Sequence, residues 1–308
     1  MTGRVICVGH AAFDSVYRID AFPARPTKVR ASRHDRSVGG MAANAACAIA
    51  ALGGQAAFWG PTGDDEIGAR IADELGRAGV ATDPRFIVPG ARSSHSAIIV
   101  EAGGERLIVS YRGDALEAPE SIIGERLLAA DVVMIDVRWP AGAQCVAARA
   151  RAQGIPIVLD GEMGNAELVR ALVPLADHVI FSETGWAEWL GHPPTGDETR
   201  AGLPALVAAG ATLAAVTMGE RGLLYASAAT TVSGQCGVLH LPAFPITVVE
   251  TLGAGDAFHG AYSLALAEGR ATDEAVRFAA AAAALRCTRS GGRAALPTRH
   301  EVLALLNS

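Results

Sequence analysis

The feature that most constrains the fold of this chain is an alternation of two patterns along most of its length. Short apolar runs typical of buried strands alternate with longer stretches rich in Ala and Leu that are typical of helices. Such alternation predicts parallel strands joined by crossover helices, and hence an α/β/α sandwich around a mostly parallel central sheet. Expected strands include 5–8, 132–137, 155–160, 178–181 and 213–217, and expected helices include 42–52, 255–267 and 272–289.

Two segments interrupt this alternation, at about 14–37 and about 92–115. Neither has a helical pattern, and both alternate polar and apolar residues as half-exposed strands do. We expect them to form a small β-sheet that covers the main sandwich as a lid. Because no linker or repeat divides the rest, residues 1–308 are expected to form a single domain.

Composition excludes several classes of protein. The net charge is −6 and the charged residues are scattered, so no basic stripe for nucleic acid is present. No apolar run is long enough for a membrane span. Five widely spaced cysteines without a CxxC pair favour free thiols in the cytoplasm. Lys28 is the single lysine among 26 basic residues, so no GxxxxGK[ST] phosphate loop can form.

The strongest local motif is Glu250-Thr-Leu-Gly-Ala-Gly-Asp256, which leads into an expected helix. Free N–H groups at a helix start bind anions, and Gly253 and Gly255 would let a ligand come close. Asp256 in the first turn could act as a base or could only cap the helix. The spacing is not that of GxGxxG, and the first strand is not followed by that motif either, which argues against a dinucleotide-dependent oxidoreductase.

A second motif, Gly39-Gly-Met-Ala-Ala-Asn44, opens another expected helix. Paired glycines before a helix allow close approach of a ligand to the backbone. Asn44 lies in an Ala-rich helix and needs polar partners, which could be a hydroxyl of a ligand or a group of the core.

Together, and in this order, the two motifs resemble the N- and C-terminal signatures of the PfkB family of carbohydrate kinases, which have the ribokinase-like fold. The resemblance covers nearly the whole chain. It implies an ATP-dependent kinase of the cytoplasm that acts on a small sugar, with Mg²⁺ held largely by the nucleotide phosphates. It also implies a homodimer formed through the lids, with no nucleic-acid or membrane partner.

The resemblance also implies roles for individual residues. Asp256 would be the catalytic base, and the amides of Gly253, Ala254 and Gly255 would stabilise the phosphoryl group in transfer. Asp14, Gly39, Gly40 and Asn44 would bind the sugar. The nucleotide would contact Ser182, Thr217, Gly219, Gly222, Cys287 and Gly291.

Two departures from the family pattern concern cations. Ser182 and Gly185 stand where the family has the Asn and Glu of a segment associated with magnesium, so Glu183 is left to act on the metal through water. Glu250 stands where the family has an Asp near a monovalent-cation site, and a requirement for potassium is therefore left open.

Several stretches resemble the sulfofructose kinases of the family most, and ketohexokinases next. They include Asp136-Val-Arg-Trp139, Val158-Leu-Asp-Gly161 and Cys287-Thr-Arg-Ser-Gly-Gly-Arg293. The resemblance implies phosphorylation of the 1-hydroxyl of a ketose such as 6-deoxy-6-sulfofructose. Fructokinase, ketohexokinase, another sugar or nucleoside kinase, and a non-catalytic sugar-binding regulator are the alternatives.

An anionic sugar would need positive charge in its pocket. Arg138 follows a predicted strand at its carboxyl end, where ligands of α/β sheets bind, and a guanidinium can hold an anion with two bonds. Lys28 in the lid could add a second charge. Ser110 stands where the resemblance to sulfofructose kinases implies a polar amide on a lid strand, and Arg112 just beyond it could substitute or could indicate another acidic or neutral ketose. Alternatively, Arg138 pairs with Asp136 or Asp160, and Lys28 is a solvated surface residue.

Overall fold

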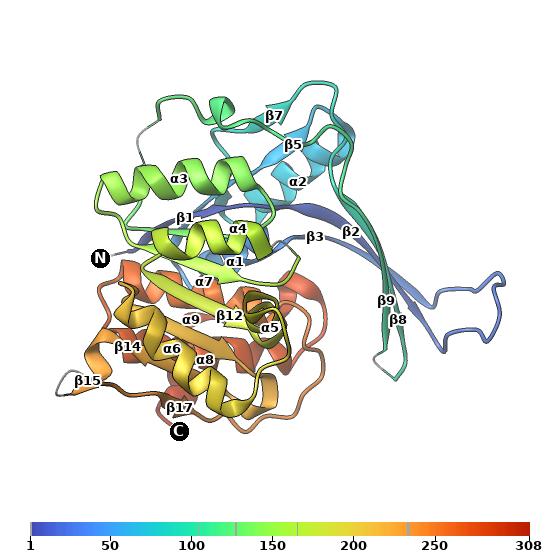
Figure 1. Ribbon diagram of the computed structural model, residues 1–308. Coiled ribbons are helices and arrows are strands. Elements are labelled where there is room, and N and C mark those ends of the chain that lie inside the picture. Colours follow the sequence, from blue (N-terminus) through green and yellow to red (C-terminus); the bar gives the residue numbers. More distant parts are fainter. Residues whose placement is uncertain (1, 104, 127, 165, 233–234) are drawn as a thin grey trace.

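A computed structural model describes residues 2–308 except 104, 127, 165 and 233–234. Within these residues, nine strands form one large sheet (Figure 1). Seven neighbouring strands run parallel, and two antiparallel strands extend one edge. In sheet order they are β17 (Leu239–Leu241), β14 (Leu223–Ser227), β13 (Leu213–Thr217), β12 (His178–Ser182), β11 (Ile157–Gly161), β10 (Val132–Ile135), β1 (Arg4–Val8), β4 (Gln55–Trp59) and β6 (Val80–Ala81).

Helices cover both faces of this sheet, because successive residues of each strand point to opposite faces. In β1, Val5 and Cys7 belong to one apolar core, while Ile6 and Val8 belong to the other. The first core contains α1 (Met41–Ala51), α2 (Glu66–Arg77), α7 (Ala254–Ala267), α8 (Thr272–Cys287) and α9 (Arg299–Leu306). The second contains α3 (Pro140–Ala152), α4 (Ala166–Leu172), α5 (Glu183–Leu190) and α6 (Gly196–Ala208). The predicted three-layer sandwich is confirmed.

A separate four-stranded sheet projects from the sandwich (Figure 1). Its strands, in sheet order, are β3 (Arg33–Gly39), β2 (Ala12–Ile19), β8 (His95–Glu101) and β9 (Arg106–Tyr111). The predicted small sheet is therefore present, although residue 104 of the predicted segment lies outside the described residues. β2 begins two residues before the predicted boundary, because the chain passes from β1 into the small sheet with only a short break.

The remaining strands form two short pairs, β5 (Pro61–Gly63) with β7 (Phe86–Val88), and β15 (Thr231–Val232) with β16 (Gln235–Cys236). Some predicted boundaries move by a few residues. The predicted helix 272–289 ends at Cys287, where the Thr288 hydroxyl donates to the Leu285 carbonyl at 2.7 Å. Among the described helices, none has the length and apolar character needed to cross a bilayer.

Candidate active site

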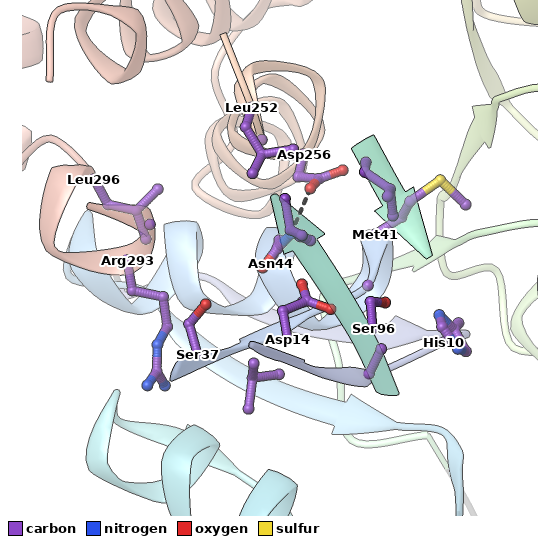
Figure 2. A pocket seen from close by; sticks show the side chains of 18 of the residues that line it. His10, Asp14, Ser37, Met41, Asn44, Ser96, Leu252, Asp256, Arg293 and Leu296 are labelled. Carbon is purple, nitrogen blue, oxygen red and sulfur yellow. Dashed lines mark hydrogen bonds between the residues drawn. The ribbon is translucent and has the colours of Figure 1, made fainter. Parts of the chain in front are cut away.

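A cavity of about 250 Å³ lies between the small sheet and the N-terminal ends of α1 and α7. Both signature motifs reach it, because each places its glycines directly before one of these helices. Figure 2 shows Asp14 and Ser96 on strands of the small sheet, Asn44 on α1 and Asp256 on α7 around one space. The structure thus brings together six predicted sugar or catalytic residues, which are Asp14, Gly39, Gly40, Asn44, Gly253 and Asp256.

Asp256 is joined to the other motif by a hydrogen bond. The Asn44 side-chain amide donates to the Asp256 carboxylate at 2.7 Å (Figure 2). The helix cap is Gly253 without any side-chain bond, so the alternative in which Asp256 caps α7 is not realised. Burial, followed by the nearby charge of Asp160, raises the pKa of Asp256 to about 7, against the opposing effect of the Asn44 bond. A carboxylate with such a pKa accepts a proton more readily at neutral pH than an ordinary Asp.

The turn before α7 has an open anion-binding geometry. Gly253 has φ 75°, a left-handed conformation that favours glycine. The amides of Gly253 and Gly255 have no backbone partner among the described residues, whereas the Ala254 amide donates to the Thr251 carbonyl at 3.2 Å. Two of the three predicted amides are therefore available to an anion at the helix start.

The Gly39-Gly40 pair before α1 makes room for the Asp14 side chain. A Cβ atom on Gly39 would lie 1.9 Å from an Asp14 carboxylate oxygen, so any other residue there would displace the Asp14 side chain. Gly40 has φ 97°, and its Cβ would lie 2.3 Å from the His10 carbonyl oxygen. Burial raises the pKa of Asp14, while a hydrogen bond from Ser96 opposes that rise.

His10 also lines the cavity, and the sequence analysis missed it. The Ser94 hydroxyl donates its proton to the Arg112 carbonyl at 2.6 Å, so it can only accept from His10 Nε2 at 2.8 Å. His10 therefore carries its proton on Nε2, and Nδ1 is an acceptor. Burial, and then the charges of Arg138 and Arg112, lower the pKa of His10 to about 4, so the ring is neutral at pH 7.

Asp136 fixes the strand ends behind this pocket. It is fully buried and accepts backbone N–H bonds from His10 at 2.9 Å, Ala42 at 3.1 Å and Arg138 at 2.8 Å. These bonds tie the end of β1, the start of α1 and the end of β10 together. The sequence signal that could have identified it is a lone carboxylate directly after an apolar strand.

Arg138 does not line the cavity but lies behind its His10 end. Its guanidinium donates from Nη2 to the Met163 carbonyl at 2.9 Å, while Nη1 is buried without a hydrogen-bond partner among the described residues. Its bond with Asp136 uses the backbone N–H and not the guanidinium. A buried donor of this kind is uncommon and can take a water or an anion as its partner.

The other predicted lid contacts lie outside the cavity lining. Lys28 is exposed in the segment between β2 and β3. Ser110 is exposed on β9, directly opposite Ser96 of β8. Arg112 is exposed just after β9, and its carbonyl holds Ser94.

The predicted nucleotide residues fall into two groups. Ser182 and Thr217 lie directly opposite each other at the ends of β12 and β13. Gly219 and Gly222 follow at φ 58° and 79°, and a Cβ on Gly222 would lie 2.0 Å from the Leu241 carbonyl. Cys287 and Gly291 form the second group, at and just after the end of α8. They are the sequence neighbours of Arg286 and Gly292, which line the cavity.

The two predicted cation-binding carboxylates are both paired with arginine. Glu183 forms a salt bridge with Arg221. Glu250 lies between Arg286 at 3.5 Å and Arg18 at 3.6 Å, so its negative charge faces two guanidinium groups. Within the described part of the chain, no group of three His, Cys, Asp or Glu residues could hold a metal.

Comparison with known proteins agrees with this geometry. Residues 2–299 match the family described as pfkB family carbohydrate kinase. Ribokinase of Bacillus subtilis (strain 168) is 33% identical over 99% of this chain and 100% of that protein. Fructokinase-2 of Solanum habrochaites is 30% identical over 88% of this chain and 87% of that protein.

Solved structures show the same fold. A putative ribokinase from Agrobacterium tumefaciens has a TM-score of 0.88 and 37% identity, covering 100% of this chain and 98% of that one. Arabidopsis thaliana ribokinase complexed with ribose and ATP has a TM-score of 0.80 and 25% identity, covering 100% of both chains. The chain therefore belongs to the pfkB family of carbohydrate kinases, with a ribokinase-like fold. As predicted, it is an ATP-dependent sugar kinase.

Proposed function

We propose that Asp256 takes the proton from a hydroxyl of a small sugar while that hydroxyl attacks the terminal phosphoryl group of ATP. The observation that carries this proposal is the Asn44–Asp256 pair, which lies beside the open Gly253 turn and across the cavity from Asp14. Acceptor, base and anion site would then lie within one small space, as phosphoryl transfer requires.

Each wall of the cavity has a role in this proposal. Asp14 and Asn44 would orient the sugar hydroxyls, and Gly39 and Gly40 would let the sugar lie against the backbone. The amides of Gly253 and Gly255 would stabilise charge on the transferring group, with Ala254 beginning the helix behind it. Mg²⁺ bound to the nucleotide would neutralise phosphate charge, and Glu183 would reach it only through water.

The nucleotide would extend from this turn along the ends of β12 and β13. Ser182, Thr217, Gly219 and Gly222 would border its phosphates, while Cys287 and Gly291 would border its base. Support for ATP as donor comes from the Arabidopsis thaliana ribokinase complex with ribose and ATP, which shares this fold over the whole chain. ATP as the donor favours the cytoplasm as the place of action.

We also propose that residues 1–308 work as one kinase domain in which the small sheet acts as a lid. Leu107, Ile108 and Val109 of its edge strand are 47% to 59% exposed, which is unusual for apolar residues on a strand. Pairing of this edge with a second copy would cover them, so a homodimer through the lids is the expected assembly.

For the sugar itself we propose a ketose that carries an anionic group, phosphorylated at its 1-hydroxyl, with 6-deoxy-6-sulfofructose as the first candidate. The support is positive charge at the end of the cavity away from Asp256. The charges of Arg138 and Arg112 both lower the pKa of His10 there, and Arg138 Nη1 is buried without a hydrogen-bond partner among the described residues. Lys28 and Ser110 would join only if the lid moved toward the pocket.

The test is ATP turnover with 6-deoxy-6-sulfofructose, fructose, fructose 6-phosphate, tagatose 6-phosphate, ribose and adenosine. We expect the highest kcat/KM with the sulfonated ketose. Preference for fructose or ribose, the substrates named by the curated relatives, would retain the sugar kinase and reject the anion pocket. Absence of turnover with all six compounds, with binding of a sugar intact, would favour a non-catalytic sugar-binding regulator.

A further inference from the structure

Arg286 is a buried charge in the cavity that holds Asp256. It lies in the last turn of α8, and its side chain is only 3% exposed. A buried guanidinium is costly unless it has partners, and it has five N–H donors to satisfy. Its bonds among the described residues run from Nη1 to the Arg289 carbonyl at 3.0 Å and from Nη2 to Glu250 at 3.5 Å. Several donors are left for a ligand.

The unused side of Arg286 faces the turn before α7. A Cβ atom on Gly253 would lie 3.9 Å from Arg286 Nε, so the guanidinium is a direct neighbour of that turn. Nε has no hydrogen-bond partner in the part of the chain that the structure describes. A permanent positive charge therefore lies beside the two open amides of Gly253 and Gly255, and both features attract the same kind of anion.

Glu250 holds this charge in place without cancelling it. Its carboxylate contacts Arg286 and also Arg18, so one negative charge faces two positive charges. The amides of Val249 and Glu250 donate to the Cys287 carbonyl at 2.8 and 3.2 Å, which fixes Glu250 against the end of α8. Arg18 lies on β2, on the same side as Asp14 because residues four apart on a strand share a face.

From this geometry we propose that Arg286 is a further catalytic residue, which donates from Nε to the terminal phosphoryl group of the nucleoside triphosphate. Glu250 and Arg18 are positioning residues that aim its guanidinium. The proposal rests on the function proposed above. Because the cation is built into the chain, turnover does not require potassium.

The test compares Arg286→Met, Arg286→Lys and the control Arg289→Met. Arg289 is a matched control, since it also pairs with a glutamate near the end of α8 but contacts Glu301 away from the cavity. We expect kcat to fall about 100-fold in Arg286→Met and about tenfold in Arg286→Lys, as for a lost charged donor to the reacting group. The control should stay within about threefold of the parent, as for a partly exposed ion pair.

Two readouts separate this role from a merely structural one. Millimolar guanidinium chloride should restore part of the turnover of Arg286→Ala but none in Asp256→Asn. The turnover rate of the parent enzyme should stay the same when potassium is replaced by tetramethylammonium. This measurement tests the proposed role of Arg286 even if the Arg286→Met variant does not fold. A rate that depends strictly on potassium would overturn the proposal.

Calorimetry with a non-hydrolysable ATP analogue and Mg²⁺ distinguishes failure of this proposal from failure of the proposed function. It needs no sugar, so it remains informative if no sugar is phosphorylated. We expect weaker binding of the analogue to folded Arg286→Met than to the parent. Equal affinity together with near-parental kcat would remove Arg286 from the phosphoryl site.

Discussion

The two walls of the cavity are built in different ways. The wall that carries Asp256 belongs to the core, since α7 is buried from Ala257 to Ala265 and packs closely against α1. The opposite wall is the small sheet, whose edge strand exposes Leu107, Ile108 and Val109. This difference suggests that the core fixes the position of Asp256, while the small sheet tolerates exposed substitutions at little cost in stability.

The largest effect is expected at the core wall, in Asp256→Asn. The amide cannot take the proton of the acceptor hydroxyl, so kcat should fall by about 100-fold or more, the usual scale for a lost general base. Sugar affinity should change little, because Asn44 and Asp14 remain. Steady-state kinetics and calorimetry check both, with exposed Asp197→Asn as control. Near-normal kcat would exclude Asp256 as the base.

Stability offers a second way to test the comparison, through Gly260→Ala and Val29→Ser. A Cβ on Gly260 would lie 2.5 Å from the Ala45 carbonyl oxygen, so α1 and α7 must separate. We expect a loss of about 2 kcal/mol in the free energy of unfolding for this overpacked site. Val29, between β2 and β3 of the small sheet, is 42% exposed, and its replacement should change stability by less than about 0.5 kcal/mol. Equal losses in urea denaturation would contradict the contrast between the walls.

Selectivity is expected to depend on the His10 end of the cavity. Arg138→Ala should lower kcat/KM for an anionic ketose about tenfold or more, as for a lost charge-assisted bond, with a smaller effect on fructose. Arg149→Ala, at a half-buried arginine near the end of α3, is the matched control. The same loss for both substrates would reject Arg138 as the residue that recognises the anion.

The smallest expected effect is a shift of pH dependence in Asp160→Asn. The Asp160 charge helps to raise the pKa of Asp256, so its removal should lower that pKa. Since the base must be ionised, the rise of kcat/KM should then occur at lower pH than in the parent. A profile that stays in place would show that Asp160 does not act on Asp256.

Much of this site could be predicted because its motifs are local. Gly39 and Gly253 each precede a helix at the carboxyl edge of the sheet, so the residues that follow them meet there. The Asn44–Asp256 bond joins positions 212 residues apart, and no pattern in the sequence gives that contact. Likewise, the family resemblance predicted that Glu250 lies near a cation site. Its ion-pair partners Arg18 and Arg286 belong to β2 and α8, and the local motif does not indicate these contacts.

The fold could be predicted for a related reason, whereas the exact ends of its helices and strands were harder to predict. The spacing of apolar residues indicates the type and order of the helices and strands, because each helix or strand must bury one apolar face. Where an element ends depends on contacts that the pattern does not contain. The strand predicted at 155–160 lies at Ile157–Gly161, where the Ile157 amide donates to Asp177 at 2.8 Å.

The central claim is that Asp256, with its raised pKa, is the base of a sugar kinase. The most direct test is kcat/KM of the parent enzyme for its preferred sugar from about pH 5 to about pH 9. Only the ionised carboxylate accepts a proton, so the account predicts a rise through one ionisation near the pKa of about 7, followed by a plateau. That ionisation should be missing from the residual activity of Asp256→Asn. A parent profile that is flat across this range would contradict the claim, and so would an ionisation near pH 7 that persists in Asp256→Asn.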